Sequence, residues 1–123
     1  MYANTAHNTY AQNNIAIESN EKLIEMLYEG ILRFNMQAKK AIQDGDIEKR
    51  VYWINRSIAI ISELINSLDS SQGQVAEYLG GLYDYQLQQL GYASIENDTT
   101  KIDAVNKVFK GLIAAWREST GVN

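Results

Sequence analysis

A heptad pattern of hydrophobic residues between positions 47 and 68 is the clearest structural signal in the chain. Aliphatic residues recur there at alternating spacings of four and three: Ile47, Val51, Ile54, Ile58, Ile61, Ile65 and Leu68. Isoleucine is also common in strands, but side chains in a strand alternate with a period of two. This spacing instead places all seven side chains on one side of a helix. The pattern therefore predicts an amphipathic helix at about 46–68 with one face in a core.

Three further stretches show helical spacing of their hydrophobic residues. They predict helices at about 19–43, 73–94 and 99–119. After the first of these, Gly45 can adopt the left-handed conformation that ends a helix, and Asp46 is a good N-cap for the next. The pair Gly80–Gly81 lies inside the third predicted helix, where each glycine costs roughly 1 kcal/mol relative to alanine. We interpret the pair as a kink or as a place of close approach.

Short connections join these four helices, and the chain of 123 residues contains no proline. Proline breaks helix interiors, so its absence suits long helices joined by short turns. Helices joined by short turns pack as antiparallel neighbours. The predicted fold is all-α: one domain, 1–123, forming an antiparallel up-down-up-down four-helix bundle with an irregular, flexible N-terminal tail at 1–18.

Composition argues against catalysis and against nucleic-acid binding. The net charge is −4, and the two basic pairs, Lys39–Lys40 and Lys49–Arg50, have acidic residues close by, so we expect no nucleic-acid partner. The chain has no cysteine, and its one histidine, His7, lies in the predicted tail. Zinc sites, di-iron sites and histidine-based triads need more ligands or bases than this. We therefore predict no enzyme activity, no catalytic residues, no metal and no cofactor.

The distribution of apolar residues also indicates where the protein works. No apolar run approaches the roughly 20 residues of a transmembrane helix, so we expect no membrane insertion. The first twenty residues lack the apolar region of a secretory signal. The absence of cysteine fits a reducing compartment. Together these features predict a cytoplasmic protein.

The first predicted helix has more apolar surface than one packing face needs. Its two adjoining stripes are Leu23, Leu27, Phe34 and Ala41, and Ile24, Ile31, Ala38 and Ile42. One interpretation is a central helix that packs on two neighbours. The other is an open groove that holds a helix of another chain. Eight tyrosines against two phenylalanines favour the groove, because tyrosine combines an apolar ring with a polar tip.

Several sequence blocks resemble a known family. EKLIEMLYEGILRFNMQAKKAIQDGDIEK, together with TYAQN, IISELINSLD, LYDYQLQQL and LIAAWRE, covers nearly the whole chain in order. These blocks are similar to those of the FliS family, the flagellar secretion chaperones of flagellin. Two departures are Asn20, where the family commonly has proline, and Glu29, where it commonly has aspartate.

The resemblance implies a four-helix bundle that binds the disordered C-terminal segment of flagellin in the cytosol. It further implies that the chaperone prevents premature polymerisation and helps deliver flagellin to the flagellar export apparatus. Other cytosolic flagellar factors could share its surface. By motif match, Tyr10 in TYAQN is the residue expected to cover the groove in the free protein and to contact the export gate.

Surplus apolarity and motif position together give a set of candidate groove residues. They are Ile24, Leu27, Tyr28, Ile31, Leu79, Leu82, Tyr83 and Tyr85. A place in the bundle core is the alternative for Leu27, Leu79 and Leu82. On the groove hypothesis, a charge at Tyr28 or Tyr83 weakens partner binding and leaves the bundle stable, whereas truncating a core residue such as Ile58 to alanine costs ~2–5 kcal/mol.

Two other functions remain open on the residues alone. The bundle could be a secretion adaptor for a different client, or it could self-associate through its surplus apolar stripe as a structural protein.

Overall fold

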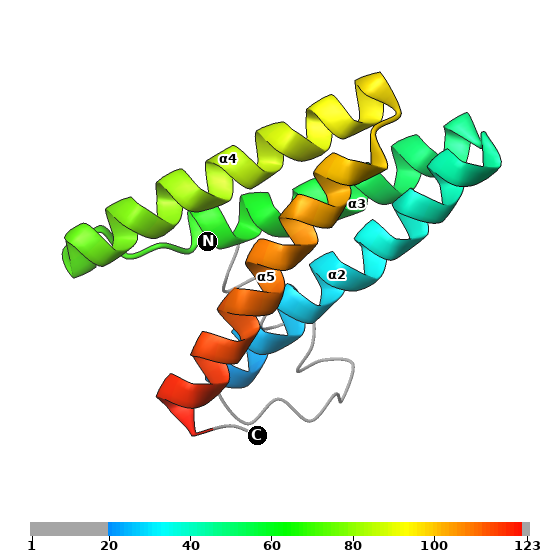
Figure 1. The fold of residues 1–123 in the computed structure, drawn as a ribbon. Coiled ribbons are helices and arrows are strands. Elements are labelled where there is room, and N and C mark those ends of the chain that lie inside the picture. Colours follow the sequence, from blue (N-terminus) through cyan, green and yellow to red (C-terminus); the bar gives the residue numbers. More distant parts are fainter. Residues whose placement is uncertain (1–19, 122–123) are drawn as a thin grey trace, which may run out of the picture.

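The computed structural model describes residues 20–121. The predicted tail at 1–18, including Tyr10, lies outside these residues, and that residues 1–123 form one domain stays a prediction. The described part contains four long helices and a short 3₁₀ turn: α2 (Asn20–Asp44), α3 (Ile47–Asn66), η1 (Ser70–Gln72), α4 (Gln74–Glu96) and α5 (Thr99–Thr120). Figure 1 shows them as an antiparallel bundle, and no strand occurs between residues 20 and 121. The predicted all-α four-helix fold is confirmed.

Local side-chain chemistry sets the ends of the helices. Gly45 has a φ of 71° and separates α2 from α3. The side chain of Asp46 then accepts a 3.0 Å hydrogen bond from the backbone N–H of Lys49, which caps α3. At its other end α3 stops at Asn66, before the predicted position 68. Asp69 caps η1 by accepting a hydrogen bond from the backbone N–H of Ser71. Leu68 therefore lies in the connection between α3 and η1.

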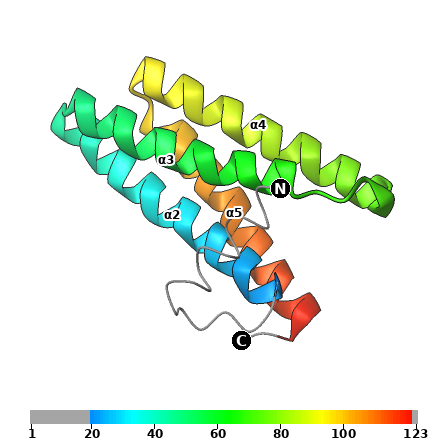
Figure 2. The same ribbon diagram turned by 180° about the vertical axis from the view of Figure 1, so that it is seen from behind.

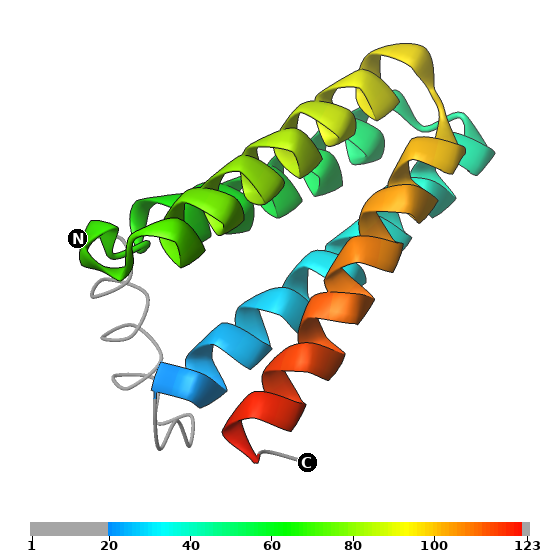
Figure 3. The same ribbon diagram turned by 60° about the vertical axis from the view of Figure 1, so that its left-hand side comes forward.

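The four helices form a closed ring of neighbours. α2 packs on α3 and α5, and α4 packs on the same two helices, so α2 and α4 lie diagonally across the bundle. Figure 2 shows the arrangement from behind. In Figure 3 the α2–α5 pair and the α3–α4 pair lie close together at the turns that follow α2 and α4. The two pairs diverge toward the beginning of α2 and the end of α5.

Aliphatic side chains and one phenylalanine fill the centre of the bundle. The largest fully buried residues include Phe109, Ile31, Ile54, Ile61, Leu64, Leu90, Ile102 and Val105. The predicted stripe of α3 is only partly inside, because Ile47 is 64% exposed and Ile58 is half-buried. A seven-residue repeat drifts by about 20° per heptad around a straight helix. That drift is too small to separate Ile47 from the fully buried Ile54, one heptad later; Ile47 is exposed as the first residue of α3, and Ser57 takes an inner position.

Polar contacts tie α2 to α5 along their length. Arg117 donates from Nε to Glu25 at 2.8 Å and from Nη2 to Glu29 at 2.7 Å. Further along, Asn35 Nδ2 donates to Asn106 Oδ1 at 2.9 Å inside the bundle. Additional contacts join Lys39 to Asp103 and the indole of Trp116 to the carbonyl oxygen of Glu21, each at 2.8 Å. These contacts fix the register of the two helices.

Candidate binding surface

The structure separates the eight predicted groove residues into three groups. Leu27, Tyr28, Ile31 and Tyr83 are buried in the core. Ile24, Leu79 and Leu82 are half-buried. Only Tyr85 is exposed, at 58%. The expectation of an open surface is therefore wrong for the four buried residues, and for Leu27 the alternative core position is correct. Partner contact by the other four stays a prediction.

Tyr28 and Tyr83 are the clearest corrections. Each is 3% exposed, and their hydroxyl oxygens are 2.7 Å apart in a hydrogen bond between α2 and α4. Both rings pack on Phe109, with ring centroids 5.8 Å and 6.3 Å from it. Burial raises the pKa of both tyrosines above the usual value of 10.0, so both hydroxyls stay protonated at neutral pH. The pair is a structural link across the bundle.

The exposed apolar surface lies elsewhere, on α4. Its members are Tyr78, Tyr85, Tyr92 and Ile95, and we call this row the α4 tyrosine stripe. Val75 is also exposed, at the start of α4, but it lies five helical turns before Ala93 and points in the same direction as that buried residue. The exposure of these side chains ranges from 50% for Tyr92 to 79% for Ile95. The three tyrosines are seven residues apart, which places them on one side of the helix. The opposite side of α4 packs into the core through Tyr83, Gln86, Leu90 and Ala93.

The glycine pair of α4 has two different surroundings. A Cβ atom on Gly80 would lie 3.4 Å from a methyl group of Leu68, whereas one on Gly81 would meet nothing within 4 Å. Gly81 is exposed three residues after Tyr78 and four before Tyr85, so it lies within the stripe. Because Gly81 has no side chain, the stripe is shallow there, and another backbone can approach α4 closely. Of the two sequence interpretations, close approach fits Gly81.

Sequence reasoning identified part of this stripe and missed the rest. It selected Tyr85 for the groove but left out Tyr92 and Ile95. The missed signal was the seven-residue spacing of Tyr78, Tyr85 and Tyr92, which is out of phase with the buried residues Tyr83 and Leu90. α4 has two apolar faces, and one sequence does not say which of them meets the core.

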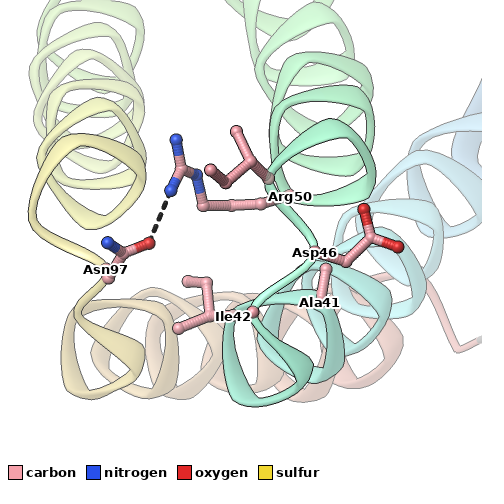
Figure 4. Close-up of a pocket in the computed structure, with 7 residues that line it drawn as sticks. Ala41, Ile42, Asp46, Arg50 and Asn97 are labelled. Carbon is pink, nitrogen blue, oxygen red and sulfur yellow. Dashed lines mark hydrogen bonds between the residues drawn. The ribbon is translucent and has the colours of Figure 1, made fainter.

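A small pocket of about 390 Å³ lies where the turn after α2 meets the turn after α4. Figure 4 shows Arg50 reaching from α3 toward Asn97, and its Nη1 donates to Asn97 Oδ1 at 2.6 Å. The pocket is lined by Ala41, Ile42, Gly45, Asp46, Ile47, Arg50 and Asn97. Asp46 is already used as the cap of α3. No two of these residues could act as a catalytic nucleophile and its base. We interpret the pocket as a gap left where the two helix turns pack together.

Comparison with known proteins adds to this geometry. The family model of the flagellar protein FliS matches residues 2–122. The chain belongs to the FliS family. A flagellar secretion chaperone FliS of Campylobacter jejuni is 55% identical over 119 residues, covering 96% of this chain and 93% of that protein. The flagellar secretion chaperone FliSB of Pseudomonas aeruginosa is 31% identical, covering 94% of this chain and 96% of that protein.

A solved structure supports the fold independently. The chain is similar to a crystal structure of a bacterial flagellar chaperone, with a TM-score of 0.79 and 21% sequence identity. The match covers 97% of this chain and 98% of the other. The predicted membership of the flagellar secretion chaperone family is confirmed, as is the four-helix fold.

Residues 20–121 contain neither a membrane-spanning helix nor a metal-binding cluster. Within this range no helix is long and apolar enough to cross a membrane. The same range contains no group of three or more histidine, cysteine or acidic side chains placed to hold a metal ion.

Proposed function

We propose that this protein is an export chaperone for flagellin. In this proposal it binds the disordered C-terminal segment of flagellin in the cytosol, prevents premature polymerisation and helps deliver the segment to the flagellar export apparatus. Membership of the family of flagellar secretion chaperones supports a flagellar export client. The observation that carries the binding step is the α4 tyrosine stripe, because it offers the client a helix face with no partner in the described part of the chain.

The stripe suits a helical segment that folds as it binds. Four large apolar side chains, from Tyr78 to Ile95, follow one side of α4 over about five helical turns, which is the pattern of a helix-docking face. Tyrosine is enriched at protein interfaces because its ring buries apolar area while its hydroxyl keeps a hydrogen bond. A disordered client loses conformational entropy on binding. Many moderate contacts along a helix offset that cost without a deep pocket.

The half-buried candidates from the sequence extend this surface. Leu82 lies three residues before Tyr85 and four after Tyr78, so it borders the stripe on α4. Ile24 and Leu79 pack against the core with part of each side chain uncovered. We propose that Leu82 contributes to client contact directly and that Leu79 contributes only at the edge. Ile24, on α2, lies diagonally across the bundle from the stripe, and we propose it as a contact only for a client that wraps round the bundle.

The proposed role of Tyr10 is to shield the same surface in the free chaperone and to contact the export gate. If the tail competes with the client, Tyr10→Ala is expected to tighten client binding several-fold. Unchanged affinity in calorimetry would remove the shielding role and leave gate contact to be tested by export of flagellin in cells.

The decisive experiment is isothermal titration calorimetry of the full chain with a synthetic peptide of the flagellin C-terminal segment from the same organism. We expect one-to-one binding with a large negative heat-capacity change, which marks burial of apolar surface. Tyr85→Asp is expected to weaken binding by at least about tenfold. Asn55→Asp, which adds the same charge at an exposed position of α3, should bind as the wild type does.

The possible outcomes test the identity of the client and the location of its binding site separately. No binding by a folded chain contradicts the flagellin client, and sedimentation then distinguishes another client from self-association. Binding that is equally strong with Tyr85→Asp keeps the client but shows that the α4 tyrosine stripe is not its site.

A further inference from the structure

A second unusual surface lies on the outside of α2 and α3, helices that Figure 2 shows side by side. Arg33 and Phe34 come from α2, and Tyr52, Trp53 and Arg56 come from α3. We call these five residues the arginine–aromatic face. The two arginines and Tyr52 are exposed, while Phe34 and Trp53 are half-buried. This face shares no residue with the α4 tyrosine stripe: α2 lies diagonally across the bundle from α4, and α3 packs beside α4.

The aromatic rings hold the two arginines in place. The guanidinium carbon of Arg56 lies 4.8 Å from the ring centroid of Phe34 and 5.5 Å from that of Tyr52. Arg33 approaches the same Phe34 ring at 5.7 Å. Trp53 closes the cluster, with its ring centroid 5.5 Å from Phe34 and 4.9 Å from Tyr52. Such cation–π contacts order the long arginine side chains before any partner arrives.

The positive charge of this cluster is not neutralised within residues 20–121. The ion pairs of this range use Lys22, Lys39, Lys49 and Arg117. Arg33 and Arg56 are not among them, although the whole chain has an acidic balance of −4. Both cations approach one aromatic ring and repel each other, and an anion bound beside them would relieve that repulsion. Arg56 Nη1 donates a 3.3 Å hydrogen bond to the Tyr52 hydroxyl, but neither arginine pairs with a carboxylate within residues 20–121. An ordered guanidinium of this kind is well suited to bind a carboxylate in bidentate fashion.

We infer that the arginine–aromatic face docks an acidic, amphipathic segment of a second protein, at the same time as the client occupies α4. Tryptophan, tyrosine and arginine are the residue types that dominate binding energy at protein interfaces. This face contains all three types, in Trp53, Tyr52 and the two arginines. Carboxylates of the partner pair with the two guanidinium groups, and apolar side chains of the partner pack on Tyr52 and Trp53. A nucleic acid would use similar contacts, but the acidic balance of the chain disfavours a polyanion.

The test uses a labelled 16-residue peptide of alternating Glu-Glu and Leu-Leu pairs, acetylated and amidated, against the full-length chain. We expect saturable binding that weakens by at least about tenfold between 50 and 300 mM salt, because charge pairs at an exposed face are screened. In nuclear magnetic resonance spectra, the indole N–H signal of Trp53 should shift. The signal of Trp116, whose indole N–H is bonded to Glu21, should stay in place.

A matched pair of variants tests the location. Arg33→Glu with Arg56→Glu is expected to reduce affinity at least about tenfold. Lys40→Glu with Lys107→Glu makes the same change in net charge at two other exposed lysines, and we expect it to lose less than threefold. Equal losses in both double variants would show a general charge effect and overturn the inference.

Two further results would also contradict the inference that the arginine–aromatic face docks an acidic segment. Tighter binding of a single-stranded DNA oligonucleotide than of the acidic peptide would assign the face to nucleic acid. Displacement of the acidic peptide by the flagellin segment would show that the two surfaces are not independent. If the flagellin segment does not bind at all, the peptide result still stands, because it depends only on α2 and α3.

Discussion

The buried tyrosine pair permits a quantitative prediction. Tyr28 and Tyr83 share one hydrogen bond of 2.7 Å between α2 and α4, and both rings are covered by the core. Changing either residue to phenylalanine removes the hydrogen bond and leaves the other hydroxyl buried without a partner. A lost hydrogen bond costs about 1 kcal/mol, and an unsatisfied buried polar group costs about 1–3 kcal/mol. Each single variant should therefore lose roughly 1–3 kcal/mol of unfolding free energy.

The double variant distinguishes this explanation from simple loss of packing. With both hydroxyls gone no polar group is stranded, so the double change should cost less than the sum of the single changes, by about 1 kcal/mol or more. Urea unfolding measured by circular dichroism gives the three values. Tyr85→Phe on the solvent side of α4 is the control and should stay within about 0.5 kcal/mol of the wild type. Strict additivity would refute the role assigned to the shared hydrogen bond.

The same tyrosine pair predicts that the protein loses folding stability at alkaline pH. The pKa of both tyrosines is raised by burial, so the folded state keeps protons that the unfolded state releases. Stability from these groups is then fully present below about pH 10 and falls as the pH rises further. The double phenylalanine variant should lose this part of the pH dependence. A charge at Tyr28 or Tyr83 is now expected to unfold the bundle, in contrast to the hypothesis drawn from the sequence.

Three further variants test other parts of the structure by thermal or urea unfolding. Ile61→Ala should cost ~2–5 kcal/mol because the side chain is fully buried, whereas Ile47→Ala should change stability by less than about 0.5 kcal/mol because Ile47 is exposed; equal costs would contradict this difference in burial. Gly81→Ala meets nothing and should stabilise by about 0.5–1 kcal/mol, and Gly30→Ala should gain less than Gly81→Ala, because its new methyl group lies 3.0 Å from the terminal methyl of Ile60, which must shift. Glu25→Gln should lower Tm at pH 7. Since its guanidinium partner on α5 lowers the pKa of Glu25, the difference should vanish as the pH falls through that lowered pKa, and a constant difference would argue against the ion pair.

The sequence predicted the fold because helical periodicity and turn chemistry are local. Gly45 and Asp46 mark the end of one helix and the start of the next in sequence and in structure alike. The binding surface was harder to predict, because periodicity shows that residues share a face but not what that face meets. Tyr83 and Tyr85 are two residues apart, on different sides of α4, and only the neighbouring helices make one buried and the other exposed.

Buried polar residues were a second feature that could not be predicted from the sequence. Asn35 and Ser57 are fully buried, yet a hydrophobic pattern treats them as gaps in a stripe. Their positions depend on contacts between helices, such as the bond from Asn35 to Asn106, and those contacts link distant parts of the chain. A single sequence contains no signal for such pairs.

The ties between α2 and α5 have a consequence for how the chain is made. Each joins the first described helix to the last, across 64 to 95 residues of sequence. A ribosome synthesises α2 before α5, so Glu25, Asn35 and Lys39 lack their α5 partners until α5 has been made. Contacts of such long range also slow folding, because a long loop must close before they form. The nascent chain therefore cannot complete its fold before α5 has been synthesised, because α5 supplies the second partner of each of these contacts.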